Sequence, residues 1–140
     1  MTLLPLRRVL DKREYSMIQY GTYGILCASR EGEEMHQGLI GFLRVRASGS
    51  LFLSDGSGEK EWEAEIISPT SLPGPGAYAF ALKQRSGRNK DISCFLRGEA
   101  GWRLYVYRTD GKLISLGQIA VCPELRQVFE ELETRAGRLA

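Results

Sequence analysis

The sequence predicts a mainly β domain: a small β-barrel flanked by one amphipathic helix at the C-terminus. Short runs rich in β-branched and aromatic residues recur between residues 22 and 120, which is typical of an all-β fold. Every separator between these runs carries glycine or proline, and these residues supply the backbone conformations that turns require. From Pro123 onward, the apolar residues change to a helical period.

The length of 140 residues fits a single domain. The composition, 43% hydrophobic and 26% charged, is that of a folded globular protein rather than a disordered chain. We expect residues 1–140 to form one domain with three parts. These parts are an N-terminal extension or helix over 1–21, the barrel over 22–121 and the helix over 122–140.

The elements follow in order from these patterns. Residues 5–18 predict a short N-terminal helix. Eight strands are then expected, and each ends at a turn that contains glycine or proline. Their ranges are 22–29, 38–47, 50–54, 61–67, 77–83, 91–97, 102–108 and 113–120.

The last segment, PELRQVFEELETRAGRL, is expected to form a helix that begins at Pro123, because proline suits the first helical position. Glutamates in its N-terminal half and arginines near its end match the helix dipole. Its apolar side chains form one stripe: Leu125, Val128, Phe129, Leu132 and Ala136. Two interpretations remain open. The stripe packs against the chain's own barrel, or it forms a partner interface with another subunit's helix through Leu125, Val128, Phe129 and Leu132.

Charge and reactive residues exclude several functions. Lys and Arg total 19 against 17 Asp and Glu, a net charge of +2, so bulk positive charge cannot drive binding. Cys27, Cys94 and Cys122 lack the spacing of a zinc site and lie in apolar runs, as expected of buried thiols in a reducing compartment. The only histidine, His36, lies in a charged, loop-like stretch that does not suit a catalytic base. We therefore expect no enzymatic activity, no cofactor and no metal.

The same sequence predicts an intracellular protein. No apolar run reaches the ~20 residues needed to span a bilayer. Pro5, Arg7 and Arg8 interrupt the apolar core that a signal peptide would need at the start of the chain. We expect no membrane partner, and a nuclear location if the protein is eukaryotic.

One stretch of the sequence favours a particular kind of barrel. In residues 38–82 a glycine-bearing strand runs into a tight turn, and two alternating strands, a Pro/Gly segment and an aromatic strand follow. The motif positions are Leu51, Leu53, Asp55, Ser57, Gly58, Pro75, Gly76 and Tyr78. This pattern resembles the first four strands of the oligonucleotide-binding (OB) folds of replication protein A and of the CST telomeric complex. The resemblance covers about one third of the chain and implies an OB-type barrel with extra strands. A pleckstrin-homology-like sandwich of seven strands and a C-terminal helix remains the alternative.

Alternation along the strands predicts which side chains face the core. The inward set of strand 38–47 is Leu39, Gly41, Leu43 and Val45. Its outward set is Ile40, Phe42, Arg44 and Arg46. In strand 61–67, Trp62 is expected in the core, whereas the outward side carries an acidic row: Glu61, Glu63 and Glu65. This row argues against strong nucleic-acid binding beside it, where OB-folds hold oligonucleotides.

Three groups of residues are candidate contacts for a nucleic acid. The loop over 83–90 holds four cations and no acid: Lys83, Arg85, Arg88 and Lys90. Strand 102–108 places a cation and two aromatic residues on one face: Arg103, Tyr105 and Tyr107. The outward face of residues 38–54 adds Phe42, Arg44, Arg46 and Phe52. Cations follow phosphates, and each aromatic ring that stacks on a base contributes roughly 1–3 kcal/mol.

The resemblance implies a protein that binds single-stranded DNA, or RNA, as a subunit of a genome-maintenance complex of the replication or telomere type. Its C-terminal helix would then join other OB-fold subunits. The near-neutral charge predicts weak binding by the isolated chain. Two other hypotheses are an OB-fold adaptor that contacts only proteins and a pleckstrin-homology-like binding module. The acidic segment 30–34 argues against the last, which needs basic residues at that hairpin.

Overall fold

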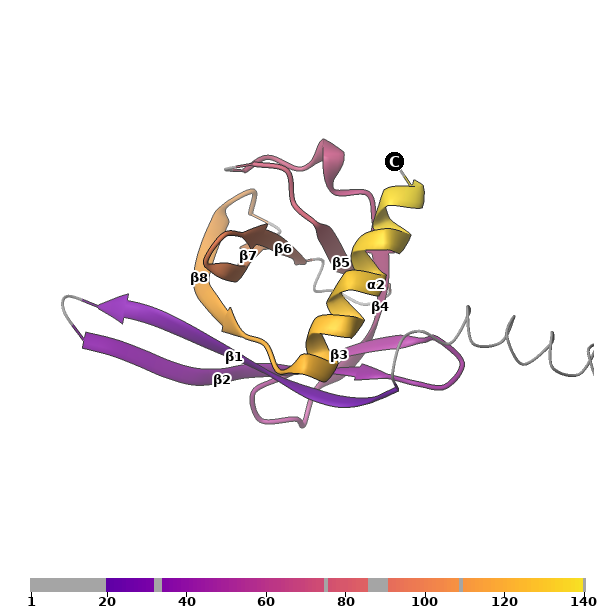
Figure 1. The fold of residues 1–140 in the computed structure, drawn as a ribbon, viewed down its shortest axis with the longest axis horizontal. Helices are drawn as coiled ribbons and strands as arrows, with labels where there is room; N and C mark the ends of the chain where they lie inside the picture. Colours follow the sequence, from indigo (N-terminus) through magenta and orange to yellow (C-terminus); the bar gives the residue numbers. More distant parts are fainter. Residues whose placement is uncertain (1–19, 32–33, 75, 86–90, 109, 140) are drawn as a thin grey trace, which may run out of the picture.

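A computed structural model of the chain describes residues 20–31, 34–74, 76–85, 91–108 and 110–139. The expected helix over 5–18 and the candidate contacts Arg88 and Lys90 lie outside these described residues. The described residues form a closed barrel of eight antiparallel strands, followed by helix α2 (Pro123–Leu139) (Figure 1). The strands are β1 (Gly21–Glu31), β2 (Glu34–Val45), β3 (Leu51–Asp55), β4 (Glu61–Ile67), β5 (Phe80–Gln84), β6 (Ile92–Gly98), β7 (Gly101–Tyr107) and β8 (Leu113–Ala120).

The strands follow one another around the barrel in chain order, and β8 closes the ring by pairing with residues 26–28 of β1. Tight turns account for much of this order, because a tight turn can only join antiparallel neighbours; the connection from β4 to β5, over residues 68–79, is longer. The prediction of a mainly β barrel followed by an amphipathic helix is confirmed. The up-and-down order differs from the Greek-key order of a five-stranded OB-fold, and the closed ring of eight strands differs from a seven-stranded sandwich.

Helix α2 packs against the barrel beside β4 and β5 (Figure 1). The ring of Phe129 meets three aromatic rings of the barrel core, with centroid distances of 5.0 to 5.1 Å. These rings belong to Phe80, Phe95 and Trp102. The four residues named for a partner interface, Leu125, Val128, Phe129 and Leu132, are each 0% exposed in the chain by itself. The structure therefore corrects that assignment: a side chain already buried in its own barrel is not available to another subunit.

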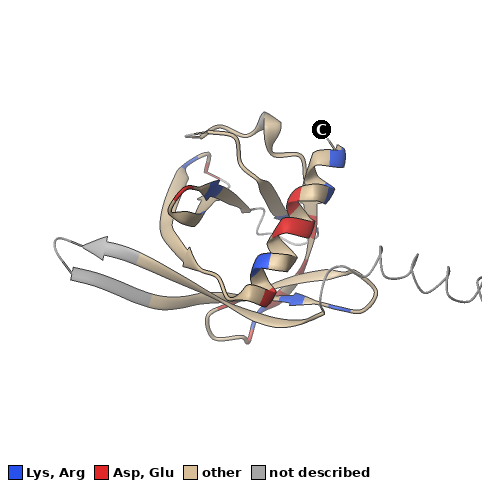
Figure 2. Ribbon diagram, viewed as in Figure 1, with Lys and Arg blue, Asp and Glu red and all other residues tan. Residues whose placement is uncertain are grey.

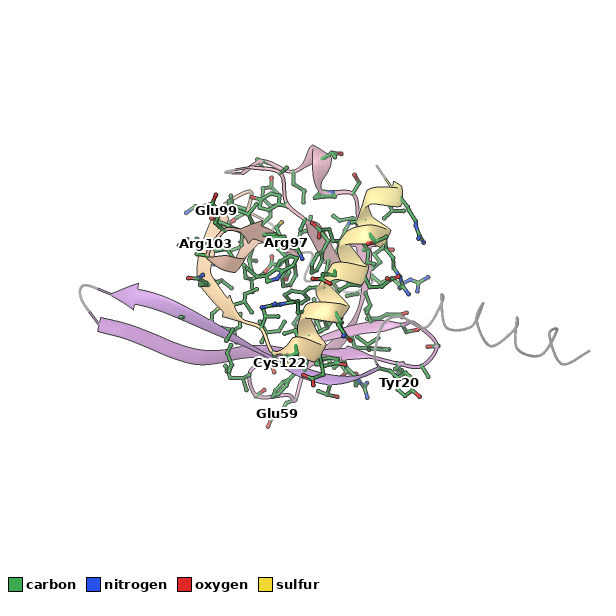
Figure 3. All side chains as sticks on the ribbon, in the orientation of Figure 1. Tyr20, Glu59, Arg97, Glu99, Arg103 and Cys122 are labelled. Carbon is green, nitrogen blue, oxygen red and sulfur yellow. The ribbon has the colours of Figure 1, made fainter. Side chains whose placement is uncertain are left out.

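Arg97 of β6 fastens the helix to the barrel. Its Nη2 atom lies 3.1 Å from Oε1 of Glu130, and its Nη1 atom lies 3.8 Å from Oε1 of Glu133. The same guanidinium lies 5.0 Å over the ring of Trp102, within the range of a cation–π interaction. Figure 3 shows Arg97 beside the helix. These polar contacts at the surface therefore add to the apolar contacts that hold α2 against the barrel.

A β-bulge changes the predicted faces of β2 at one point. Ile25 pairs with Gly41 and Leu26 pairs with Leu39, so Ile40 has no partner of its own on β1. The extra residue reverses the alternation beyond it. Leu39, expected inside, is 40% exposed, and Ile40, expected outside, packs against the core. The remainder of β2 towards Val45 follows the predicted alternation.

A second apolar cluster lies on the opposite side of β5 and β6 from the barrel core. Ala81 and Cys94 pair across these strands and are both buried. The segment between β4 and β5, which includes the short helix η1 (Pro69–Ser71), contributes Tyr78 to this cluster. The Tyr78 hydroxyl donates a hydrogen bond to the Pro73 carbonyl at 3.0 Å. β5 begins at Phe80 and not at the predicted residue 77.

Strands β1 and β2 extend beyond the barrel as a two-stranded ribbon (Figure 1). They pair with each other as far as Glu31 and Glu34. In contrast, β2 pairs with β3 only over 41–45, and β1 pairs with β8 only over 26–28. The outer part of the ribbon therefore has strand edges without a neighbour among the described residues.

Candidate nucleic-acid interface

The outer face of β2 and β3 carries two arginines stacked on one aromatic ring. Arg44 lies opposite Phe52 in the β2–β3 pair, and Arg46 follows two residues later in the chain. Their guanidinium carbons lie 5.0 Å and 4.5 Å from the centre of the Phe52 ring, as in cation–π interactions. We call these three residues the Arg–Phe stack. The structure thus brings three of the predicted contacts together.

Phe42 lies next to the Arg–Phe stack on the outer side of β2. It pairs with Ser54 of β3 and with Gly24 of β1. A Cβ on Gly24 would lie 3.8 Å from the Phe42 ring, and one on Gly58 would lie 3.9 Å from it. The ring therefore rests over two backbone segments that carry no side chain, and it remains half-exposed at the edge of the stack.

The acidic row of β4 is present but largely balanced by neighbouring cations. Glu61 forms an ion pair with Arg44. The Glu63 carboxylate accepts a hydrogen bond from Arg85 Nη1 at 2.9 Å, and Glu65 lies opposite Lys83 in the β4–β5 pair. Such exposed pairs contribute only about 0–1 kcal/mol each to stability. Their main effect is to lower the net positive charge of this face.

Trp62 confirms the predicted inward side of β4, since it packs against the barrel core. Of the predicted phosphate-binding loop, the structure describes Lys83 and Arg85. Both lie across β4 from the Arg–Phe stack, with Lys83 half-buried and Arg85 exposed. Figure 2 shows basic and acidic residues interspersed over the fold and not separated onto two faces.

The third predicted group, on β7, lies on a different part of the surface. Tyr105 packs edge-on against Tyr78, with ring centroids 5.9 Å apart, and Tyr107 packs against the same second cluster. Both rings are half-buried there, so they help to cover the outside of β6 and are not open stacking platforms. Arg103 is exposed on β7 (Figure 3). Strands β4 to β6 separate this group from the Arg–Phe stack.

The thiols differ in accessibility. Burial raises the pKa of Cys27 and of Cys94 to about 11, so both are protonated at neutral pH. Cys122 is exposed and precedes α2 (Figure 3). Within the described ranges, no group of three or more His, Cys, Asp or Glu residues is placed to hold a metal ion. No helix among them is long and apolar enough to cross a membrane.

Sequence reasoning missed a groove at one end of the barrel. It has a volume of about 420 Å³ and lies between the β2–β3 turn, β4 and the last turns of α2. Its lining includes Arg85 and, from the helix, Arg135. Arg135 lies 50 residues from Arg85 in the chain, and no local pattern links the two. Only the packing of α2 brings them to one groove.

Comparisons with known proteins leave the family open. A scan against protein-family models found no match. Searches of curated proteins and of solved structures found no significant match either. The fold and the candidate interface therefore define a class, a closed eight-stranded β-barrel with a C-terminal helix and a mixed-charge outer face.

Proposed function

We propose that this protein binds single-stranded nucleic acid, DNA or RNA, through the outer face of β2 to β5. The Arg–Phe stack is the observation that carries the proposal. Aromatic rings and guanidinium planes both stack on unpaired bases, and the guanidinium N–H groups also bind phosphate. Arg46 is exposed, and its guanidinium stacks on the Phe52 ring.

The arginines of this face are expected to bind phosphate only weakly. Arg44 and Arg85 each contact a carboxylate of β4, so a phosphate must compete with that carboxylate. Nucleic-acid affinity depends mainly on the number of phosphates neutralised. We therefore propose that the protein acts as one subunit of a larger genome-maintenance complex, in which other subunits supply additional contacts.

Fluorescence anisotropy of a labelled single strand of ~20 nucleotides tests this function at low and at physiological salt. Saturable binding that weakens with salt is expected. Arg46→Glu should weaken it at least tenfold, because the variant loses one cation and places a carboxylate beside the Phe52 ring. Arg126→Glu is the matched control, since Arg126 is exposed on α2 and belongs to none of the three predicted contact groups. No binding at low salt, or equal effects of both variants, would show the proposal to be wrong.

A gain-of-affinity variant gives an independent test. Glu61→Gln removes a negative charge and releases Arg44 from its ion pair. Binding should tighten by roughly two- to eightfold at low salt, the effect of about one additional phosphate contact. The stability of the protein should change by less than about 1 kcal/mol, because the pair is exposed. Weaker binding by this variant would contradict the assignment of Arg44.

The exposed leucines of the ribbon favour a second candidate, an adaptor that contacts proteins only. Leu26 and Leu39 are cross-strand partners and are 41% and 40% exposed. Ala120 of β8 lies beside Leu26 and is also exposed. Sedimentation of the intact chain tests this candidate by its self-association. Association that Leu26→Ser with Leu39→Ser abolishes, in a protein that binds no nucleic acid, would favour the adaptor.

A further inference from the structure

We propose that the groove between the β2–β3 turn, β4 and α2 holds the phosphate backbone of the bound strand, with Arg135 as a phosphate contact. This inference rests on the proposed nucleic-acid function and extends it to a second surface. The groove is lined by Arg85, which follows β5, and by Arg135, from the penultimate turn of α2. Its apolar lining comes from Leu51, Ala64, Ile66 and Leu139.

The two guanidinium groups retain hydrogen-bond donors. Among the described residues, Arg85 contacts Glu63 at 2.9 Å. The Nε atom of Arg135 lies 3.9 Å from Oε1 of Glu131, one turn earlier on the helix. An arginine carries five N–H donors, so one carboxylate contact leaves others for a phosphate. The side chains of Arg85 and Arg135 are 62% and 30% exposed, respectively, and are accessible to a ligand.

The β2–β3 turn adds a neutral hydroxyl donor close to Arg135. Ser48 and Ser50 line the groove, and the Ser48 hydroxyl donates to Ser50 Oγ at 3.1 Å, so the Ser50 hydroxyl is the donor that remains for a ligand. Between them, Gly49 adopts φ +89°. A Cβ on Gly49 would lie 3.9 Å from Nη2 of Arg135. Hydroxyl groups beside a guanidinium are suitable partners for phosphate oxygens.

The β2–β3 turn links the groove to the Arg–Phe stack. The Arg46 N–H donates to the Ser50 carbonyl at 3.0 Å, and the Gly49 N–H donates to the Arg46 carbonyl at 2.8 Å. Arg46, which stacks on Phe52, is therefore part of the same turn that forms one wall of the groove. A strand with a base on Phe52 can continue over this turn towards Arg135.

Two carboxylates oppose an anion in the groove, and their pairing limits this opposition. Glu63 and Glu65 both line it. Glu63 is ion-paired with Arg85, and Glu65 lies opposite Lys83 in the β4–β5 register. Because these charges nearly cancel, Arg135 should supply one phosphate contact and not a strong anion site. The expected effect is therefore modest and specific.

The salt dependence of binding measures this contact. Each phosphate contact on a single strand adds about 0.7 to the slope of log affinity against log salt. Arg135→Gln should reduce the slope by about 0.7 and weaken binding about eightfold at ~50 mM salt. Arg126→Gln, on the first turns of the same helix and outside the groove, should leave the slope unchanged.

A second variant separates the phosphate contact from a structural role. Glu131→Gln breaks the same helical ion pair but keeps the guanidinium, so binding should be unchanged or tighter. If Glu131→Gln weakens binding as much as Arg135→Gln, the pair only supports the helix and the inference is wrong. An unchanged slope in Arg135→Gln, with Arg46→Glu still weakened, overturns the groove alone. Failure of the wild-type protein to bind refutes the proposed function itself.

Discussion

Phe129→Ala tests whether helix α2 is an integral part of the barrel core. The side chain is 0% exposed and contacts Phe80, Phe95 and Trp102. If the helix completes the core, removal of this ring leaves a cavity at the centre of an aromatic cluster. If the helix were an accessory that joins other subunits, the barrel would tolerate the substitution.

The expected loss of stability follows from the buried area. Burial of a phenylalanine ring withdraws on the order of 150 Å² of apolar surface, which is worth about 4 kcal/mol at ~25 cal/mol/Å². Phe→Ala substitutions in protein cores cost about 3–5 kcal/mol. For 140 residues, the entropy of unfolding of roughly 0.3 kcal/mol/K predicts a fall in Tm of about 14 °C.

Urea unfolding followed by circular dichroism, with a thermal scan, measures this effect. Leu139→Ala is the matched control: Leu139 ends the same helix and is 56% exposed, so its change should stay within about 0.5 kcal/mol. A loss below about 1 kcal/mol for Phe129→Ala would refute the reasoning. So would a change in oligomeric state without a change in stability, because the ring would then pack against a partner.

Three further predictions follow from the fold. One thiol, Cys122, should react rapidly with a thiol reagent in the native protein because it is exposed; Cys27 and Cys94 should not, because both are buried and burial raises their pKa to about 11. Asp55→Asn should destabilise the protein at pH 7, since hydrogen bonds, first that from Ser57, lower the Asp55 pKa; the difference should disappear as the pH falls below about 4. Gly41→Ala should cost about 1–3 kcal/mol in urea unfolding, because its Cβ would lie 2.3 Å from the Ser54 carbonyl oxygen.

Each of these predictions has a control. All three thiols should react after unfolding in guanidinium chloride; three fast thiols in the native protein would contradict the burial. Ser57→Ala should reduce the pH dependence of stability in the same direction as Asp55→Asn, because it removes the largest cause of the lowered pKa. Gly38→Ala should be tolerated, since no heavy atom of the described residues, apart from Gly38 and its chain neighbours, lies within 4 Å of its Cβ position. Equal costs at Gly38 and Gly41 would contradict the clash.

The candidate site was predictable from the sequence only in part. Alternation places Arg44 and Phe52 on outward faces, and the structure confirms that they lie together. The alternation of residues could not show that Glu61 pairs with Arg44, because β2 and β4 are not adjacent in the chain or in the barrel. Likewise, Tyr105 reads as an open aromatic residue in its strand, yet the segment after β4 places Tyr78 against it.

The sequence by itself determined the type and order of the elements, since a period of two, a helical period and glycine-bearing turns depend on residues close in the chain. Only the tertiary structure decided which faces are free. The bulge at Ile40 exchanged one inward residue for another, the apolar stripe of α2 entered its own barrel, and Arg135 met Arg85 across a groove. These outcomes depend on pairing and packing between distant segments, whose free energy no local pattern records.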